Sequence, residues 1–415
     1  MFRRLLPLEE AKQTISRLKL AVLGSEETSL LNGHNRILAE DVTSSLDIPP
    51  FDRSTVDGYA VKAEDAFGAD EKNPVQLRIC GVVNIGEQPK IEVTTGQTAE
   101  IATGAPIPEG ADSVIMVEDT ERIGNQLRVF NTVTKGENVM KKASDLKKGE
   151  KLLVAGQVLS SREMGVLAAS GAASVKVFAV PRVAVLSTGG EVAEPGKKLL
   201  PGKIYDINAY TISAAVLESG GRPVHLGVIP DDKNLLREAL LHALECADMV
   251  VTSGGVSVGP KDLMPQTVAS LGEPGLIFSG IAVKPGKPTT MAMIGQKTVF
   301  ALPGHPTSAL LMFQLLVRPV IWQLAGRAAI RADMVRAWSG MRMFSAKGRR
   351  TFIMVRLRKD NTGKLVAEAV ETGASGAITT LAKADGYVEI PENQQFVDKG
   401  EKIEVTLFGS VVSLV

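Results

Sequence analysis

The strongest constraint on the fold of this chain is a regular alternation of apolar runs and helical segments between residues 179 and 327. Short, almost wholly apolar runs recur there in the order RVAVLST, PVHLGVI, DMVVTSG, TTMAMI and TVFALPG. A strand that is apolar on both sides must be covered on both faces, which is typical of parallel sheets joined by helical crossovers. We therefore predict a central α/β sandwich with a parallel-rich sheet over residues 179–327.

The rest of the chain has a different character. Residues 46–148 alternate short β-like runs with Gly, Pro and Asn breaks, and this pattern predicts an inserted small β domain. Residues 328–415 are β-rich in the same way and predict a C-terminal β barrel. An amphipathic helix opens residues 1–45, and we expect it to pack against residues 149–178 in an N-terminal linker domain. The predicted fold class is thus multidomain α/β plus β.

Composition narrows the class of protein. The formal net charge of the 415 residues is +1, and a nucleic-acid binder usually shows a basic excess. The two cysteines, Cys80 and Cys246, form no disulfide framework and no Cys-x-x-Cys metal site. The N-terminus is charged, and apolar stretches such as 309–314 are too short to cross a bilayer. We expect a cytoplasmic protein that binds neither nucleic acid nor membrane.

Four loops of unusual composition follow the predicted strands of the α/β block. They are Thr188–Glu191, Gly254–Gly259, Lys284–Pro288 and Gly304–Pro306. The carboxyl ends of parallel strands form one edge of a sheet, and ligands of open α/β folds bind outside that edge. We therefore predict that all four loops face one crevice.

The glycine-rich loop 254–259 precedes a predicted helix, and this combination favours a phosphate ligand. Glycines let backbone N–H groups approach an anion, and the helix N-terminus adds partial positive charge. The loop is not a P-loop, because Pro260 stands where that motif needs its lysine and Lys261 comes one residue late. The structural alternative is a tight turn without a ligand, which the neighbouring loops disfavour.

Charged residues near these loops suggest an oxyanion and a metal ion. Lys284 and Lys287 flank a rigid Pro-Gly turn and can hold an oxyanion as two point charges. Several carboxylates suggest Mg²⁺, a hard ion with oxygen ligands, and they are Glu191, Asp206, Asp231, Asp232 and Asp262. Asp231 or Asp232 can equally serve as the N-cap of the following helix.

Other segments are ordinary when each is taken alone. Asp57 precedes a glycine, Thr103 and Ser375 lie in Gly-containing turns, and Arg349 lies in a basic turn. Taken together, the segments PPFDRSTVDGYAV, ATGAPIPEGADSV, LSTGGE, SGGVSVG, KPGKP, LPGHPTSA and TGASG occur in this order. This series closely resembles the molybdopterin molybdenumtransferase (MoeA) family, and the resemblance spans essentially the whole chain.

The resemblance implies a molybdopterin-binding fold for residues 179–327 and an elongated homodimer, with residues 1–45 and 149–178 in a dimerisation role. The implied enzyme inserts molybdate into adenylylated molybdopterin (molybdopterin-AMP) and releases AMP with Mg²⁺ as cofactor. Its active site would lie between the α/β domain of one protomer and the β domain of the other. The pterin adenylyltransferase that makes the substrate is a candidate partner protein.

Carried over by motif, the resemblance also implies roles for single residues. The catalytic set would comprise Asp57 and Thr103 from the other protomer, with Glu191, Lys284 and Lys287. Glu191 and Asp262 would hold the metal ion, and Asp231 or Asp232 would lie at the nucleotide. The backbone of Gly254, Gly255 and Ser257 would hold the pterin phosphate. Molybdate needs cationic and N–H donors, and its pocket would add Ser308, Arg349 and Ser375 to the two lysines.

The chain departs from the family pattern at four places. Gly190 and His305 stand where the family usually has Asp and Asn, and Gly280 stands where a lysine often precedes the Lys-Pro-Gly-Lys turn. The segment Ala143–Asp145 replaces a common Gly-Glu-Asp. Because Gly280 and His305 lie near the expected oxyanion, tungstate is open as the alternative substrate.

Three other functions compete with this interpretation. The α/β block alone would permit a pterin adenylyltransferase that uses ATP. A non-catalytic scaffold, similar to the receptor-clustering role of gephyrin, would bind partners without releasing AMP. A generic nucleotide or sugar-phosphate binder is the third, because a fold alone does not define a function.

Overall fold

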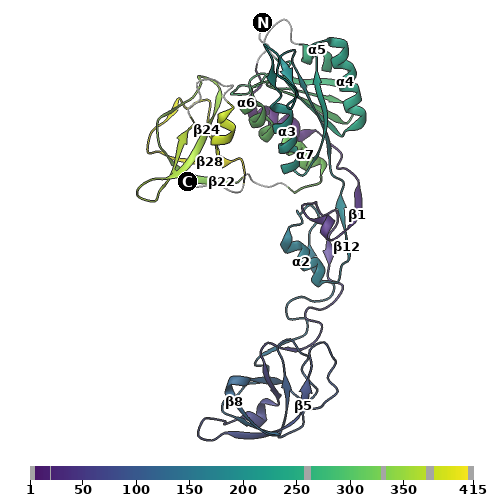
Figure 1. The fold of residues 1–415 in the computed structure, drawn as a ribbon, viewed down its shortest axis with the longest axis vertical. Coiled ribbons are helices and arrows are strands. Elements are labelled where there is room, and N and C mark those ends of the chain that lie inside the picture. Colours follow the sequence, from purple (N-terminus) through teal and green to yellow (C-terminus); the bar gives the residue numbers. More distant parts are fainter. Residues whose placement is uncertain (1–4, 19, 257–262, 329–332, 371–377, 410–415) are drawn as a thin grey trace.

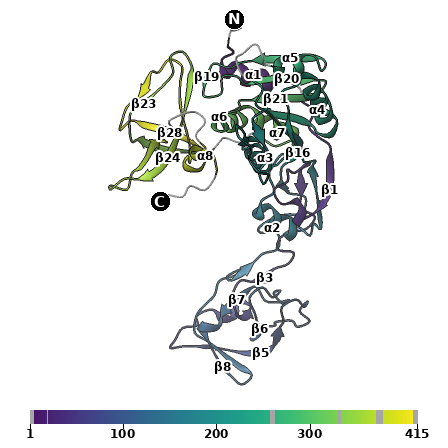
Figure 2. The ribbon, with the colours of Figure 1, turned by 45° about the horizontal axis from the view of Figure 1, so that its top comes forward.

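The computed structural model describes residues 5–18, 20–256, 263–328, 333–370 and 378–409 of the chain. Figure 1 shows an elongated molecule. The central α/β domain and the C-terminal domain lie side by side at one end. A small domain around α2 lies below the α/β domain, and the inserted β domain forms the opposite end (Figures 1 and 2).

The central domain is built on a mixed, largely parallel six-stranded sheet. Four neighbouring strands run parallel, and the last two are antiparallel to their neighbours. The strands, in spatial order, are β16 (Arg222–Ile229), β13 (Arg182–Thr188), β17 (Met249–Ser253), β21 (Lys297–Leu302), β20 (Thr290–Ile294) and β18 (Pro274–Ser279). The parallel-rich sheet predicted from the apolar runs is confirmed, whereas strand β18 was not predicted.

Helices cover both faces of this sheet, because its strands are apolar on both sides. On one face, Val183 and Val185 pack against α1 (Leu8–Arg17), α3 (Asn208–Glu218), α6 (Pro306–Met312) and α7 (Arg318–Leu324). On the other face, Ala184 and Leu186 pack against α4 (Lys233–Cys246) and α5 (Leu263–Ala269). Successive side chains along β13 point to opposite faces of the sheet, so they pack in two separate hydrophobic cores.

Helix Pro306–Leu324, made of α6, a π-helical turn Phe313–Val317 and α7, is continuous in the structure. By length and apolar composition it could cross a membrane, but 61% of it is buried within the fold. Phe313, Leu316 and Val317 are fully buried in the α/β core. It is therefore the core helix of this domain.

The small domain below the sheet is formed by two separate parts of the chain. Strand β1 (Ser25–Ser29) pairs with β12 (Ser174–Phe178), and β2 (Val42–Thr43) pairs with β11 (Lys151–Leu153). Helix α2 (Ser161–Ala169) begins at Ser160, whose backbone N–H donates to Glu163 at 2.9 Å in a capping box.

Helix α1 does not join this small domain. We expected the N-terminal helix to pack against residues 149–178, but its buried residues Leu8, Ala11 and Ile15 lie in the α/β core. The helix also ends at Arg17, so the buried Leu20 lies beyond it. Hydrophobic periodicity identified the apolar face of α1, but it carries no information about which domain covers that face. The domain boundaries drawn from the sequence remain a prediction.

The inserted β domain and the C-terminal domain are both β structures. The first holds β7 (Ser113–Met116), β4 (Gly58–Val61), β6 (Gln97–Ile101), β5 (Val75–Val83), β9 (Gln126–Val129) and β8 (Thr120–Ile123) in one sheet. Short strands β3 (Arg53–Ser54) and β10 (Val139–Met140) pair at its base. In the C-terminal domain a five-strand barrel closes through the pairing of β24 with β26, and its strands are β24 (Arg350–Lys359), β25 (Leu365–Ala369), β22 (Met334–Ser339), β28 (Lys402–Leu407) and β26 (Gly386–Ile390).

Candidate functional site

The loops after three central strands touch one another at the carboxyl edge of the sheet. The backbone N–H of Gly254, after β17, donates to the carbonyl of Leu302 in β21 at 3.2 Å. The side-chain amide of Asn208 donates to Ser253 Oγ at 2.6 Å and to the carbonyl of Gly304 at 2.7 Å. The predicted loops after β17 and β21 therefore lie close together beside the start of α3.

Gly254 is the glycine that this arrangement requires. Its φ is +90°, and a Cβ atom there would lie 2.3 Å from the carbonyl oxygen of Thr188 at the end of β13. Gly255 is also left-handed, and its Cβ would lie 2.8 Å from Thr188 Oγ1. Only glycine allows this backbone to pass so closely over β13, which is consistent with a backbone cradle for an anion. Ser257 and Asp262 lie outside the described residues.

Buried polar atoms without hydrogen-bond partners concentrate at the same edge. Nine such atoms occur in the described part of the chain, and five lie at the ends of β13 and β17 or at the start of α3, namely Ser187 Oγ, Thr188 Oγ1, Asp206 Oδ2, Asn208 Oδ1 and Thr252 Oγ1. Buried polar groups in native proteins usually have partners, so this cluster marks a place where solvent or a ligand completes the structure. The sequence interpretation missed Asn208 and Thr252. The available signal was that two apolar strands end in hydroxyl residues.

The acidic residues at this edge differ in whether their carboxylates already hold local structure or are exposed to solvent. Asp232 caps α4, because its Oδ1 accepts the N–H groups of Asn234 and Leu235 at 2.8 and 3.0 Å. Asp231 Oδ2 instead accepts the N–H of Gly190 at 3.2 Å, which links the loops after β16 and β13. The exposed Glu191 carboxylate lies against Gly189. The open choice between the two aspartates as N-cap is thus settled in favour of Asp232.

The carboxylates at this edge are of the ligand type that Mg²⁺ takes. The described residues contain no group of three or more potential metal-ligating side chains. Mg²⁺, however, is commonly held by one or two carboxylates together with substrate phosphates and waters. Glu191 supplies one exposed carboxylate, and Asp206 supplies a buried carboxylate oxygen without a donor.

The Lys-Pro-Gly-Lys turn lies at the same edge, because β18 ends and β20 begins there. Short strand β19 (Val283–Lys284) pairs with β24 of the C-terminal domain, with Val283 opposite Arg350. This pairing places the half-buried Arg349, which directly precedes β24, near Ala282, two residues before Lys284. The turn also packs on α6, because a Cβ at Gly286 would lie 2.7 Å from the side chain of Met312.

Arg350 links the C-terminal barrel to helix α1 of the α/β domain. Its guanidinium lies 2.7 Å from Glu9 of α1 and 3.0 Å from both Glu389 and Glu392. Burial alone would lower the pKa of Arg350, but the three carboxylates raise it overall. Three elements that are far apart in sequence, α1, β19 and β24, therefore hold the cationic turn in position.

Two departures from the family pattern lie next to this turn and at the start of α6. Gly280 has a φ of +88°, and a Cβ there would lie 2.9 Å from the side chain of Leu5. A lysine at this position would be strained, so the chain is built without it. His305 occupies the N-cap position of α6, and Ser308 is buried two residues inside that helix.

Asp57 and Thr103 form a contact of their own in the inserted β domain. Asp57 Oδ1 accepts the backbone N–H of Thr103 at 2.7 Å and its hydroxyl at 3.0 Å. These two hydrogen bonds lower the pKa of the exposed Asp57 carboxyl below its usual value. The carboxylate is therefore held in one orientation at a solvent-facing surface.

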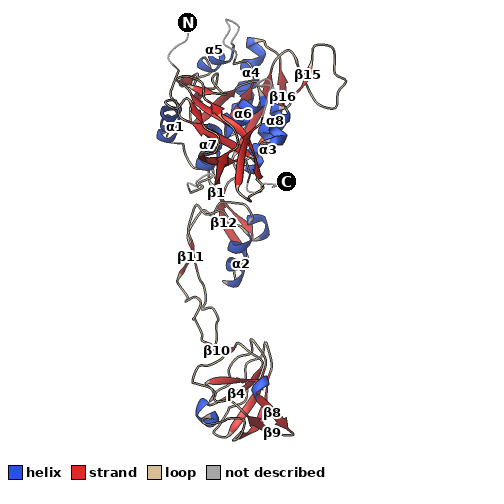
Figure 3. Ribbon diagram, turned by 90° about the vertical axis from the view of Figure 1, so that its left-hand side faces the viewer, coloured by secondary structure: helices blue, strands red, loops and turns tan. Residues whose placement is uncertain are grey.

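The structure does not bring Asp57 and Thr103 to the carboxyl edge of the same chain. The small domain separates the inserted β domain from the α/β domain in every view (Figures 1–3). Of the predicted molybdate-pocket residues, Ser375 lies outside the described residues. The predicted residues thus fall into two described groups at opposite ends of the molecule.

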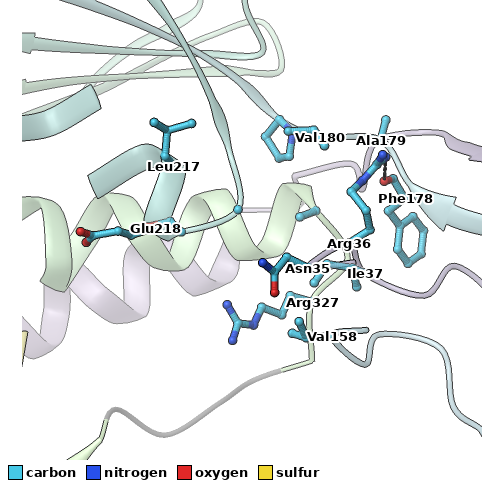
Figure 4. A pocket seen from close by; sticks show the side chains of 14 residues that line it. Asn35, Arg36, Ile37, Val158, Phe178, Ala179, Val180, Leu217, Glu218 and Arg327 are labelled. Atoms are coloured by element: carbon cyan, nitrogen blue, oxygen red, sulfur yellow. Dashed lines mark hydrogen bonds between the residues drawn. The ribbon is translucent and has the colours of Figure 1, made fainter. Parts of the chain in front are cut away.

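A cavity of about 300 Å³ lies elsewhere, between the small domain and the amino edge of the sheet (Figure 4). Its lining includes Arg36, Phe178, Pro181 and Arg327. Pro181 directly precedes β13, so this cavity and the predicted crevice lie at opposite edges of the sheet. We therefore place the candidate site at the carboxyl edge, where the buried polar atoms gather.

Comparison with known proteins places this architecture in one class. Residues 184–323 match a family described as a probable molybdopterin binding domain. Residues 6–171 match the MoeA N-terminal region (domain I and II), and residues 336–408 match the MoeA C-terminal region (domain IV). The fold and site thus define a molybdopterin-binding α/β domain flanked by MoeA-type regions.

Full-length relatives give the family itself. The chain is 36% identical to the molybdopterin molybdenumtransferase of Nostoc sp., covering 92% of this chain and 88% of the relative. It is 32% identical to the Bacillus subtilis molybdopterin molybdenumtransferase, over 97% and 94% of the two chains. A crystal structure of the Pyrococcus horikoshii MoeA protein superposes with a TM-score of 0.84 at 42% identity, covering 98% of this chain and all of that one. This chain belongs to the MoeA family.

Proposed function

We propose that this protein is the molybdopterin molybdenumtransferase of molybdenum cofactor biosynthesis and inserts molybdate into molybdopterin. Its whole length matches MoeA relatives that bear this activity in their names. The observation that carries the proposal is the pairing of β19 with β24, which joins the C-terminal domain to the segment that leads into the Lys284–Lys287 turn. A dianionic oxyanion needs cationic donors, which the two lysines and Arg349 would supply, and the neighbouring sheet edge is suited to the pterin phosphate.

We further propose that the pterin arrives as its adenylylated form and that AMP is released on insertion. Gly254 and Gly255 would hold the pterin phosphate through their backbone N–H groups, with Ser257 continuing the loop. Asp231 would hold the nucleotide end, since Asp232 is committed to capping α4. The buried hydroxyls and Asp206 below the loop would complete their hydrogen bonds with the bound substrate or its waters.

The molybdate pocket in this proposal comprises Lys284, Lys287, Ser308, Arg349 and Ser375. The two lysines and Arg349 neutralise the dianion and orient it toward the dithiolene sulfurs. Glu191 and Asp262 would hold Mg²⁺, which neutralises charge that develops on the phosphoanhydride during its cleavage. The bonds between Asp57 and Thr103 keep an ionised carboxylate ready for the same reaction.

The position of Asp57 supports a homodimer. It belongs to the inserted β domain, which lies at the opposite end of the molecule from the α/β domain that carries the lysine turn (Figure 1). A second copy would supply Asp57 and Thr103 to the edge, so that the two ends complete one another. We propose a cytoplasmic homodimer that receives its substrate from the pterin adenylyltransferase.

Tungstate is the alternative substrate, and one observation favours keeping it. Gly280 stands where a lysine often lies near the oxyanion. A lysine could adopt the backbone conformation of Gly280 only with strain. The adenylyltransferase and scaffold alternatives are disfavoured, because the chain matches the family through its N-terminal and C-terminal regions as well as the α/β domain.

The test is AMP release from adenylylated molybdopterin and Mg²⁺, measured with molybdate, with tungstate and with neither. Release that requires an oxyanion and fails in Asp57→Ala is the expected result, and the preferred anion identifies the metal. If the substrate binds but neither molybdate nor tungstate triggers AMP release, the insertase proposal is wrong. AMP formation from ATP and unmodified pterin would instead support the adenylyltransferase.

A further inference from the structure

A loop stands out from the α/β domain directly after Glu191. It connects the short parallel strands β14 (Val192–Ala193) and β15 (Ile204–Tyr205), and Figure 3 shows it projecting next to β15. We call residues 194–205 the finger. The hydroxyl of Tyr205 donates to the carbonyl of Lys197 at 2.9 Å, and Lys197 pairs with Glu194 at 2.6 Å. The finger is thus held in shape by its own contacts, as Ω-loops are.

The finger exposes apolar side chains that its own chain does not cover. Leu200 is 60% exposed and Ile204 is 57% exposed, while Leu199 and Tyr205 are each 40% exposed. Single exposed apolar residues are common, but a contiguous group on a projecting loop is typical of a contact surface. Beside them, Lys198 forms no ion pair with any described residue.

The inserted β domain carries a second surface of the same kind around Asp57. In the antiparallel pairing of β4 with β7, Gly58 lies opposite Met116, and the N–H of Val117 donates to the carbonyl of Asp57 at 3.1 Å. Met116 is 38% exposed and Val117 is 49% exposed. The next residue, Glu118, is exposed and forms no ion pair with a described residue. We call Asp57 and residues 116–118 the Asp57 face.

The two surfaces complement one another. Each has an apolar centre beside a residue of the proposed catalytic set, and each has an unpaired charge at its rim. Lys198 is positive on the finger, whereas Glu118 and Asp57 are negative on the Asp57 face. An apolar core with opposite charges at the rim is the usual composition of a specific protein interface.

The surfaces do not meet within one chain, because they lie at opposite ends of the elongated molecule (Figures 1 and 3). We propose that the finger of one copy docks on the Asp57 face of a second copy and thereby positions Asp57 beside Glu191. This proposal rests on the proposed function, in which Asp57 serves the site of another copy, and it assigns the contact that brings Asp57 there.

Cross-linking tests the contact directly. Leu200→Cys and Val117→Cys are made in separate full-length chains that lack Cys80 and Cys246, mixed under subunit exchange and treated with a short bis-maleimide. We expect a cross-linked pair containing one chain of each kind. Phe67→Cys replaces Val117→Cys as the control. Phe67 is 83% exposed, but it lies near the amino end of β6, whereas Thr103 follows the carboxyl end of that strand.

Charge reversal supplies the second measurement. We expect Lys198→Glu to lower kcat/KM for AMP release by about tenfold, and Glu118→Lys in the same chain to restore most of it. Three results would overturn the finger contact. They are equal cross-linking to Phe67→Cys, capture of added adenylyltransferase in place of a second copy, and no restoration of activity by the double charge reversal. If wild-type protein releases AMP but no Leu200–Val117 cross-link forms, the docking proposal fails while the proposed function stands. Absence of AMP release from wild-type protein would instead count against the function.

Discussion

The two halves of the proposed site are built in different ways. The carboxyl edge of the α/β domain is assembled from distant segments, since Asn208 bonds to Ser253 and Gly304, and β19 pairs with β24. The Asp57 face lies within one domain, where the Asp57 carboxylate accepts two hydrogen bonds from Thr103 and β4 pairs with β7. A site made of such parts can keep its binding surface rigid while its carboxylate arrives on a separate domain.

The largest expected effect tests whether the two halves belong to different copies. Asp57→Ala and Lys287→Ala should each lower kcat for AMP release by about 100-fold or more, the usual loss when a positioned catalytic group is removed. When the two variants exchange subunits, mixed dimers regain one intact site. Random pairing should then restore about a quarter of wild-type activity, because half of the dimers are mixed. Failure to recover activity in verified mixed dimers would mean that both residues serve one chain.

Alanine substitutions of two left-handed glycines, one in each region, test how closely the backbone of each region is packed. Gly254→Ala should lower the free energy of unfolding of the α/β domain by about 3 kcal/mol, because its Cβ would meet the Thr188 carbonyl. Gly104 is also left-handed, with φ +86°, but nothing lies within 4 Å of its Cβ position. Gly104→Ala should therefore cost about 1 kcal/mol. Chemical denaturation with probes in each domain measures both, and equal losses would contradict the close approach at Gly254.

The charge state of Asp57 gives a smaller and more local test. Because its pKa is lowered, its hydrogen bonds stabilise the folded state above the unfolded pKa of about 3.9, and this stabilisation is lost as the pH falls through the lower folded value. Thr103→Val removes the hydroxyl donor and keeps the backbone donor. The pKa of Asp57, followed by NMR of its carboxyl carbon, should rise part of the way toward the usual value. An unchanged titration would show that the hydroxyl contributes nothing.

The smallest effect concerns the base of the inserted β domain. Ala143 has a φ of +59°, a left-handed backbone conformation that favours glycine. Ala143→Gly should raise the free energy of unfolding of that domain by about 0.5 kcal/mol, since the left-handed strain exceeds the entropy that glycine loses. Ala111, whose φ is not positive, is the matched control, and Ala111→Gly should destabilise. A loss of stability in both variants would contradict the strain at Ala143.

The sequence predicted the parts of the fold that depend on local pattern. Strands β13, β17 and β21 are apolar throughout, and a buried parallel strand has that composition. Helix α2 begins after the N-cap residue Ser160 and has Glu163 in its first turn, and this Ser-x-x-Glu capping box is a local sequence signal. Strand β18 was missed, because Pro274 and Gly275 at its start are typical of turns.

Contacts between distant segments could not be predicted from pattern alone. Asn208 was missed because its partners lie in loops that only the folded sheet brings beside it. The burial of α1 in the α/β core was missed for the same reason. The assignments of Lys284, Lys287, Asp57 and Thr103 came from motif resemblance, and their roles remain proposals. Their separation into two groups, which the resemblance implied, is seen in the domain arrangement.

The small domain is crossed twice by the chain, through the paired strands β2 and β11 on one side and β1 and β12 on the other. Two paired antiparallel strands resist bending and twisting more than a single linker would, so the small domain joins the inserted domain to the α/β domain as a stiff arm. The chain passes between the small domain and the α/β domain near residues 20–24 and again at residues 179–181, beside the cavity of Figure 4. Any rotation of the arm about these two passages would displace Asp57, which lies beyond the small domain, further than it displaces a residue of the small domain.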